Sequence, residues 1–248
     1  MDIPARLLAL DGTVSYYYRA FDKGEAACCN MDAPHDAASI IKLPIMVEAI
    51  RQFESGEAAR DEVIRIRDAD RVPPCGVLTF MHEGLPVQLI DLVWLMVTLS
   101  DNMAANLLMD RLTLPAIRRE MMALGMTGCR LNRKLFAPGP GNIITCRDIC
   151  MLFEQLYAGT LVSAAASHEM LDMLTGQQLQ NKIPMLLPLD MRIAHKTGED
   201  EGTSHDVGIV YAKKPFLVGF FGTGVDAPSF NRTVQNISLE LFLENGGI

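Results

Sequence analysis

Residues 191–222, MRIAHKTGEDEGTSHDVGIVYAKKPFLVGFFG, decide the fold class. Apolar side chains here fall in short runs with a period near two, which is typical of strands, and turn-forming residues separate the runs. We predict three strands, at Met191–Lys196, Val207–Ala212 and Leu217–Gly222. Ser229–Glu244 then closes the chain as a helix.

The N-terminal end of the chain carries a similar strand pattern. Val14–Phe21 is β-branched and aromatic and lies between turn signals, so it predicts a strand, with Ala26–Met31 as its hairpin partner. Strands at both ends of the chain favour one antiparallel sheet built from both.

Between these ends, apolar residues recur at helical spacing. The expected helices are Ile40–Phe53, Leu89–Leu99, Asn102–Leu112, Pro115–Leu124, Ser163–Leu174 and a further one around Gln177–Lys182. Thr145 and Asp148 form an [ST]-x-x-[DE] capping box that starts another helix. Arg71–Gly84 and Arg130–Ile144 are rich in proline and glycine and are predicted loops.

This order of elements predicts an α/β protein of the α+β type. A discontinuous α/β sheet domain, residues 1–34 and 190–248, carries the terminal helix and packs on an all-α domain, residues 35–189.

Composition limits the function classes. The chain has 248 residues, is 49% hydrophobic and has a formal net charge of −8. It is too apolar to be disordered, and its acidity argues against nucleic acid as a partner. No uninterrupted run of 18 apolar residues occurs, so no membrane span is predicted. These figures alone identify no partner and leave the oligomeric state open.

The cysteines and the N-terminus favour a reducing compartment. The six cysteines lack C-x-x-C spacing and are expected to be reduced, mostly buried thiols. No basic n-region and apolar core of a secretory signal is visible, which predicts a cytoplasmic location. The histidines show no metal spacing, and no metal or other cofactor is predicted.

Ser39-Ile40-Ile41-Lys42 is the first candidate for chemistry. A serine hydroxyl is a weak nucleophile that needs a neighbouring base. At positions i and i+3 of a helix, Ser39 and Lys42 lie on one face, so the lysine can reach the hydroxyl. The same four residues also fit a capping serine followed by a solvated lysine.

Two further motifs follow along the chain. Ser100-Asp101-Asn102 lies between two apolar helices and fits either helix caps or a proton-relaying hydroxyl beside a substrate-binding amide. Lys196-Thr197-Gly198 ends a predicted strand and fits either a strand end or an anion site that a substrate approaches closely.

The three motifs, in this order, resemble the class A-like branch of the serine β-lactamases and penicillin-binding proteins. The resemblance covers nearly the whole chain and includes Pro74-Cys75-Gly76-Val77-Leu78 and His205-Asp206-Val207-Gly208. It implies the β-lactamase/transpeptidase-like fold, with the active site between the two domains.

The resemblance also implies residue roles. Ser39 corresponds to the acyl-accepting nucleophile, Lys42 to its activator and Ser100 to the proton shuttle. Asn102 corresponds to the ligand of the substrate amide. The remaining substrate-binding residues are Lys196, Thr197 and Gly198, with Glu199 contributing its backbone N–H, beside that of Ser39, to the oxyanion hole. His195, His205 and Asp206 are expected to have structural roles.

One departure from the family affects the expected function. The family's loop glutamate, which activates the deacylating water, has no counterpart, because none of the 30 carboxylates falls within Arg130–Ile144. Glu83, Glu199, Asp200 and Glu201 are conceivable substitutes that the sequence does not place. We expect a serine hydrolase that is acylated by β-lactams or related amides and esters and deacylates slowly. The alternatives are a penicillin-binding or sensor module without turnover, a D-Ala peptidase or an esterase.

Overall fold

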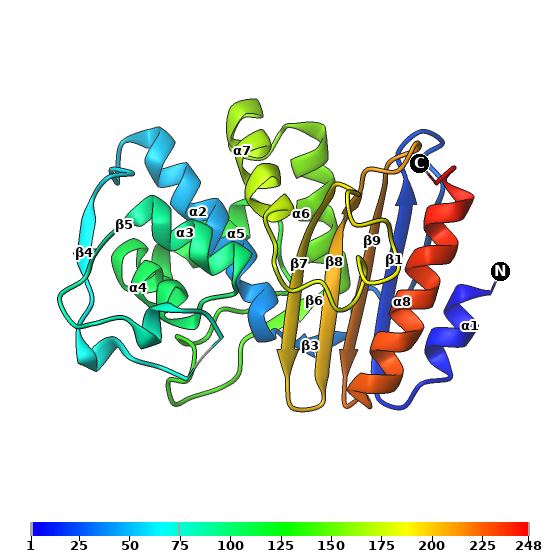
Figure 1. Ribbon diagram of the computed structural model, residues 1–248, viewed down its shortest axis with the longest axis horizontal. Helices are drawn as coiled ribbons and strands as arrows, with labels where there is room; N and C mark the ends of the chain where they lie inside the picture. Colours follow the sequence, from blue (N-terminus) through cyan, green and yellow to red (C-terminus); the bar gives the residue numbers. More distant parts are fainter. Residues whose placement is uncertain (1, 74, 248) are drawn as a thin grey trace.

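The computed structural model describes residues 2–73 and 75–247, and Met1, Pro74 and Ile248 lie outside them. An antiparallel five-stranded sheet, in the order β2-β1-β9-β8-β7, is built from both ends of the chain (Figure 1). Its strands are β1 (Thr13–Ala20), β2 (Ala26–Cys29), β7 (Ile193–Asp200), β8 (Thr203–Val210) and β9 (Phe216–Thr223). The expected sheet and its terminal helix are therefore confirmed.

Helices cover both faces of this sheet (Figure 1). On one face lie α1 (Ile3–Leu8) and α8 (Ala227–Glu244). On the other side lie α2 (Lys42–Ser55), α3 (Leu89–Thr98), α4 (Asn102–Leu112), α5 (Leu114–Ala123), α6 (Cys146–Ala158) and α7 (Ala164–Thr175). Each sheet face has its own apolar cluster, because successive strand residues point to opposite faces. The predicted boundaries near residues 34 and 190 stay a prediction.

Short elements complete the chain. A 3-10 turn, Ala38–Ile41, leads directly into α2. Two small ladders pair β3 (Pro34–Asp36) with β6 (Ile143–Thr145), and β4 (Val63–Arg65) with β5 (Pro86–Gln88). The β3–β6 ladder ties the end of the loop 130–144 to the chain immediately before Ser39.

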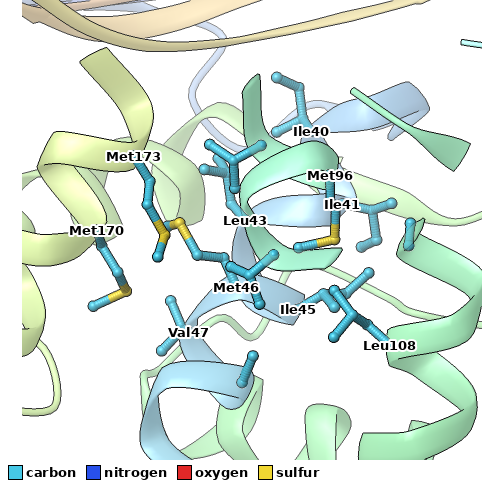
Figure 2. Packing of buried hydrophobic residues seen from close by; sticks show 14 of the residues in the cluster. Ile40, Ile41, Leu43, Ile45, Met46, Val47, Met96, Leu108, Met170 and Met173 are labelled. Atoms are coloured by element: carbon cyan, nitrogen blue, oxygen red, sulfur yellow. The ribbon is translucent and has the colours of Figure 1, made fainter. Parts of the chain in front are cut away.

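Helix α2 is the centre of the helical block. Ile40, Leu43, Met46 and neighbouring side chains pack among α3, α4 and α7 (Figure 2). Burial on every side fixes α2, and therefore also the turn that carries Ser39 at its start.

One predicted helix was wrong, and the prediction of mostly buried thiols holds for only half of the cysteines. No helix forms around Gln177–Lys182, because the Gln177 side chain binds backbone groups instead: it donates to Val97 O at 2.9 Å and accepts from Leu179 N at 3.0 Å. The thiols are also less buried than expected, since only Cys129, Cys146 and Cys150 of the six are buried.

Candidate active site

Ser39 and Lys42 meet at the start of α2. Lys42 Nζ donates to Ser39 Oγ at 2.9 Å. Ala38, just before the serine, has a φ of 41°, a left-handed conformation that a non-glycine residue adopts only when its surroundings enforce it. The packing of α2 supplies that constraint and holds the hydroxyl in place.

Lys42 is fully buried and is surrounded by acceptors from the turn between α3 and α4. Its Nζ donates to Ser100 O at 2.6 Å, Ser100 Oγ at 3.0 Å and Asn102 Oδ1 at 2.8 Å. Burial, reinforced by the nearby Lys196 charge, holds the pKa of Lys42 well below its usual range. An amine with a lowered pKa can take a proton from a hydroxyl.

Lys196 reaches the same serine from the sheet. Its Nζ donates to Ser100 Oγ at 3.0 Å and to Thr197 O at 2.8 Å. Burial lowers the pKa of Lys196 to about 7. The Ser100 hydroxyl therefore lies between two lysine amines, and a φ of 55° at Ser100 marks a second strained position beside the nucleophile.

Asp101 organises the chain around this turn. Its Oδ1 accepts from Ala104 N at 2.9 Å and caps α4, as the capping interpretation predicted. Its Oδ2 accepts from Val77 N at 2.6 Å and Leu78 N at 2.9 Å. The carboxylate thus fixes the loop that contains Cys75. The backbone N–H of Asn102 donates to the Cys75 carbonyl oxygen at 3.1 Å.

Gly198 is required by the approach of strand β7 to the Ser39 turn. A Cβ at this position would lie 3.0 Å from Ile40 Cγ1 and 3.3 Å from Ile40 N. The motif predicts that this glycine lets a substrate approach closely. The structure gives it a closer neighbour in this chain, because β7 is the edge strand of the sheet and packs directly on that turn.

The side chains of His195, His205 and Asp206, on β7 and β8, are bonded within the fold. His195 Nδ1 lies 2.9 Å from Asp206 Oδ1, and Asp206 Oδ2 accepts from Ile183 N at 2.9 Å. His205 Nε2 bonds to Asp36 O at 2.8 Å, and burial lowers the pKa of His205 to about 3. These groups bond to each other and to backbone, as the structural interpretation expected.

A cavity of about 710 Å³ opens at Ser39. Its lining residues come from the Ser39 turn, the loop 130–144 and the end of β7: Asp36, Ala37, Ala38, Ser39, Cys75, Asn102, Arg133, Leu135, Phe136, Ala137, Gly141, Asn142, Glu199, Asp200, Glu201 and Thr203. Of the substitute acids considered from the sequence, the cavity lining includes three, Glu199, Asp200 and Glu201, but not Glu83.

Asn106 was missed as a site-building residue. Its Oδ1 accepts from Leu135 N at 2.9 Å, and its Nδ2 donates to Leu135 O at 3.0 Å. The spacing offered a signal, because Asn106 lies one helical turn after Asn102 and so shares its face. It fixes the loop at the position where Leu135 lines the cavity.

Residues 2–73 and 75–247 contain neither a metal-holding cluster nor a helix suited to cross a membrane. No group of three or more His, Cys, Asp or Glu side chains is arranged to hold a metal ion. Within the same ranges, no helix has the length and apolar character that crossing a bilayer requires.

Comparison with known proteins gives a consistent picture. The family described as the β-lactamase enzyme family matches residues 2–243. A β-lactamase from Sphaerobacter thermophilus DSM 20745 is 32% identical, with 99% of this chain and 96% of that chain covered and a TM-score of 0.92. PBP-A is 22% identical, with 98% and 94% covered and a TM-score of 0.90. A point mutant of PBP-A, solved as an acyl-enzyme complex with penicillin G, has the same identity and coverage and a TM-score of 0.89. No match is found among curated proteins.

Proposed function

The chain belongs to the β-lactamase enzyme family of serine hydrolases, and we propose that it forms an acyl-enzyme on Ser39 with β-lactams or related amides and esters and releases it slowly. The observation that carries the proposal is the convergence of Ser39, Lys42, Ser100 and Lys196 through hydrogen bonds of 2.9–3.0 Å.

Acylation begins with proton transfer from Ser39 to Lys42. The lowered pKa of Lys42 leaves a neutral amine that accepts the proton as Ser39 Oγ attacks the carbonyl carbon. The carbonyl π electrons move onto oxygen, where the backbone N–H groups of Ser39 and Glu199 stabilise the developing charge.

Collapse of this intermediate breaks the carbon–nitrogen bond. Ser100 gives its proton to the leaving nitrogen and takes the one that Lys42 received, which its position 3.0 Å from both lysine amines supports. Lys196 and Thr197 bind the substrate carboxylate, and the second N–H of the Asn102 amide, whose first N–H binds Pro73 O, holds the substrate amide.

We infer slow release from the wall of the cavity that the loop 130–144 forms. The loop residues in this wall carry no carboxylate that could activate water: Arg133, Leu135, Phe136, Ala137, Gly141 and Asn142. The carboxylates of the cavity lie instead at Asp36 and at the end of β7. General-base assistance contributes about 10²–10⁴-fold to a rate, so a deacylation step without it is slow by that order. This wall also favours the second candidate, a penicillin-binding module that stays acylated, which the acyl-enzyme of the PBP-A mutant resembles.

Intact-protein mass spectrometry after mixing with penicillin G tests the proposal. We expect a mass increase equal to the whole penicillin that persists after the free drug is removed. Ser39→Ala should give no adduct, whereas Ser55→Ala, which changes an exposed serine at the other end of α2, should be acylated normally. An adduct that survives Ser39→Ala refutes the nucleophile, and drug consumption at tens of turnovers per second refutes slow release.

A further inference from the structure

The charged side chains that line the cavity are mostly acidic. Asp36, Glu199, Asp200 and Glu201 contribute carboxylates, and Arg133 contributes one guanidinium. The buried lysines Lys42 and Lys196 lie behind Ser39, where burial lowers the pKa of both.

Among the residues that the structure describes, ion pairing neutralises one of these four carboxylates, that of Glu199. Glu199 pairs with the buried Lys182 and also accepts from Asn181 Nδ2 at 2.9 Å. The Asp200 carboxylate accepts from the backbone of Glu201 at 2.8 Å and makes no ion pair among the described residues.

The carboxylates of Asp36 and Glu201 make neither a hydrogen bond nor an ion pair within residues 2–73 and 75–247, and both side chains are exposed. Arg133 Nε binds Pro140 O at 3.2 Å and holds its own loop. Three carboxylates, those of Asp36, Asp200 and Glu201, therefore face one guanidinium in the cavity. We call these three carboxylates the acidic rim.

The acidic rim lies on the acyl side of the proposed reaction. Asp200 and Glu201 follow Glu199 directly at the end of β7, and a strand rises about 3.3 Å per residue. They are therefore about 3–7 Å beyond the N–H that Glu199 offers to the acyl carbonyl. A substituent on the carbon next to that carbonyl can reach them.

Thr203 gives an independent sign that a ligand is expected there. This residue is only 2% exposed and lines the cavity beside the rim. In the part of the chain that the structure describes, its hydroxyl makes no hydrogen bond, so it is free to bond a polar group that enters the cavity. Phe136, 55% exposed in the same cavity, adds an aromatic face of the kind that attracts cations.

We propose that this site prefers substrates whose acyl portion carries a positively charged amine. The inference rests on the acyl transfer proposed above and names its substrate class. An ammonium group beside the acidic rim gains attraction from Asp200 and Glu201 and can donate to Thr203 Oγ1, whereas an anionic acyl group is repelled. Charge pairs at this range in a solvent-filled cavity change a rate by about three- to tenfold.

Three penicillins that differ at one carbon test the preference: penicillin G is neutral there, ampicillin carries an α-amine and carbenicillin an α-carboxylate. Acylation rate constants are measured by mass spectrometry at about pH 6, where an α-amine is protonated. We expect ampicillin to react about three- to tenfold faster than penicillin G, and carbenicillin slower by a similar factor. The spread should shrink as ionic strength rises from about 0.01 to 1 M.

Variants assign the preference to the rim. The double variant Asp200→Asn with Glu201→Gln should reduce the differences between the acylation rate constants of the three penicillins. The single variant Asp36→Asn should do the same. Glu25→Gln, which changes an exposed carboxylate in the turn between β1 and β2 at the opposite end of the sheet, should leave these differences intact. Equal rates for the three drugs, or an unchanged spread in both rim variants, would overturn the charge preference alone. Failure of all three drugs to acylate Ser39 would overturn the proposed function as well.

Discussion

A carboxylate placed at residue 135 should accelerate release of the acyl group. Leu135 lines the cavity with Ser39, and its backbone is held on both sides by the Asn106 amide. The side chain is half-buried, so a glutamate there can meet both the cavity and water. Carboxylates elsewhere in the cavity raise the pKa of an added one, which suits it to act as a base.

The magnitude follows from general-base catalysis. A positioned base contributes about 10²–10⁴-fold, or about 3–5 kcal/mol of the barrier. The surrounding residues did not evolve around a glutamate, so we expect the lower end: Leu135→Glu should shorten the lifetime of the penicillin G adduct about 100-fold.

The assay follows adduct loss by mass spectrometry after free drug is removed. Leu135→Gln is the matched control, because an amide has the shape of the carboxylate but cannot take a proton at neutral pH. Both variants should keep the melting temperature of the parent protein within a few degrees. Equal release rates for Leu135→Glu and Leu135→Gln would refute the argument that a missing base slows the reaction.

Three further predictions concern the lysines and the backbone around the nucleophile. The pH profile of kcat/KM for acylation should be bell-shaped: it falls at low pH as Lys42 gains a proton, and falls above about 7 as Lys196 loses one. Asp101→Ala should lower the free energy of unfolding by about 3 kcal/mol, read from denaturant titration, because three backbone N–H groups lose a charged acceptor; Asp101→Asn should lose less. Gly198→Ala should slow acylation at least about tenfold with a smaller effect on melting temperature, because its Cβ displaces the turn at Ile40; an unchanged acylation rate would contradict this.

The sequence predicted most helices and strands because their residues follow regular apolar periods. It placed β8 four residues late, since Thr203-Ser204-His205-Asp206 reads as polar although the structure buries all four in this strand. Three of the four have bonded side chains: Ser204 Oγ donates to Asn231 Oδ1 of α8 at 2.7 Å, His205 Nε2 bonds to Asp36 O, and Asp206 Oδ2 accepts from Ile183 N. A hydrophobic pattern cannot reveal a strand whose burial depends on partners distant in the chain.

Helix α1 was missed for a related reason. It spans only Ile3–Leu8 and lies beside α8, where Arg6 pairs with Glu240. A helix this short is unstable alone, so tertiary packing rather than local sequence decides it.

The candidate site likewise combines residues that local sequence brings together with residues that only tertiary packing brings together. Ser39 and Lys42 are near neighbours in sequence, so helical spacing alone brings them together. Lys196 joins them only through the packing of β7 on the Ser39 turn, which no local spacing encodes. The sequence contains no pattern that predicts Asp36 in the cavity lining. The residue lies there because the β3–β6 ladder pairs it with Ile143.

Lys196 gives activity and folding stability opposite dependences on pH above about 7. Folding lowers the pKa of Lys196 from 10.5 to about 7. Above pH 7 the unfolded chain therefore keeps a proton that the folded chain has released, and the free energy of unfolding rises with pH. Cys129 opposes this above its ordinary pKa of 9.0, because burial raises its pKa to about 12 and the folded chain then holds the extra proton. Between about pH 7 and 9, the charge on Lys196 that the proposed reaction uses is therefore lost while these two groups together make the fold more stable. Below about pH 7, the charge on the buried Lys196 lowers the free energy of unfolding. Such a cost is expected of a residue that serves binding and proton transfer rather than packing.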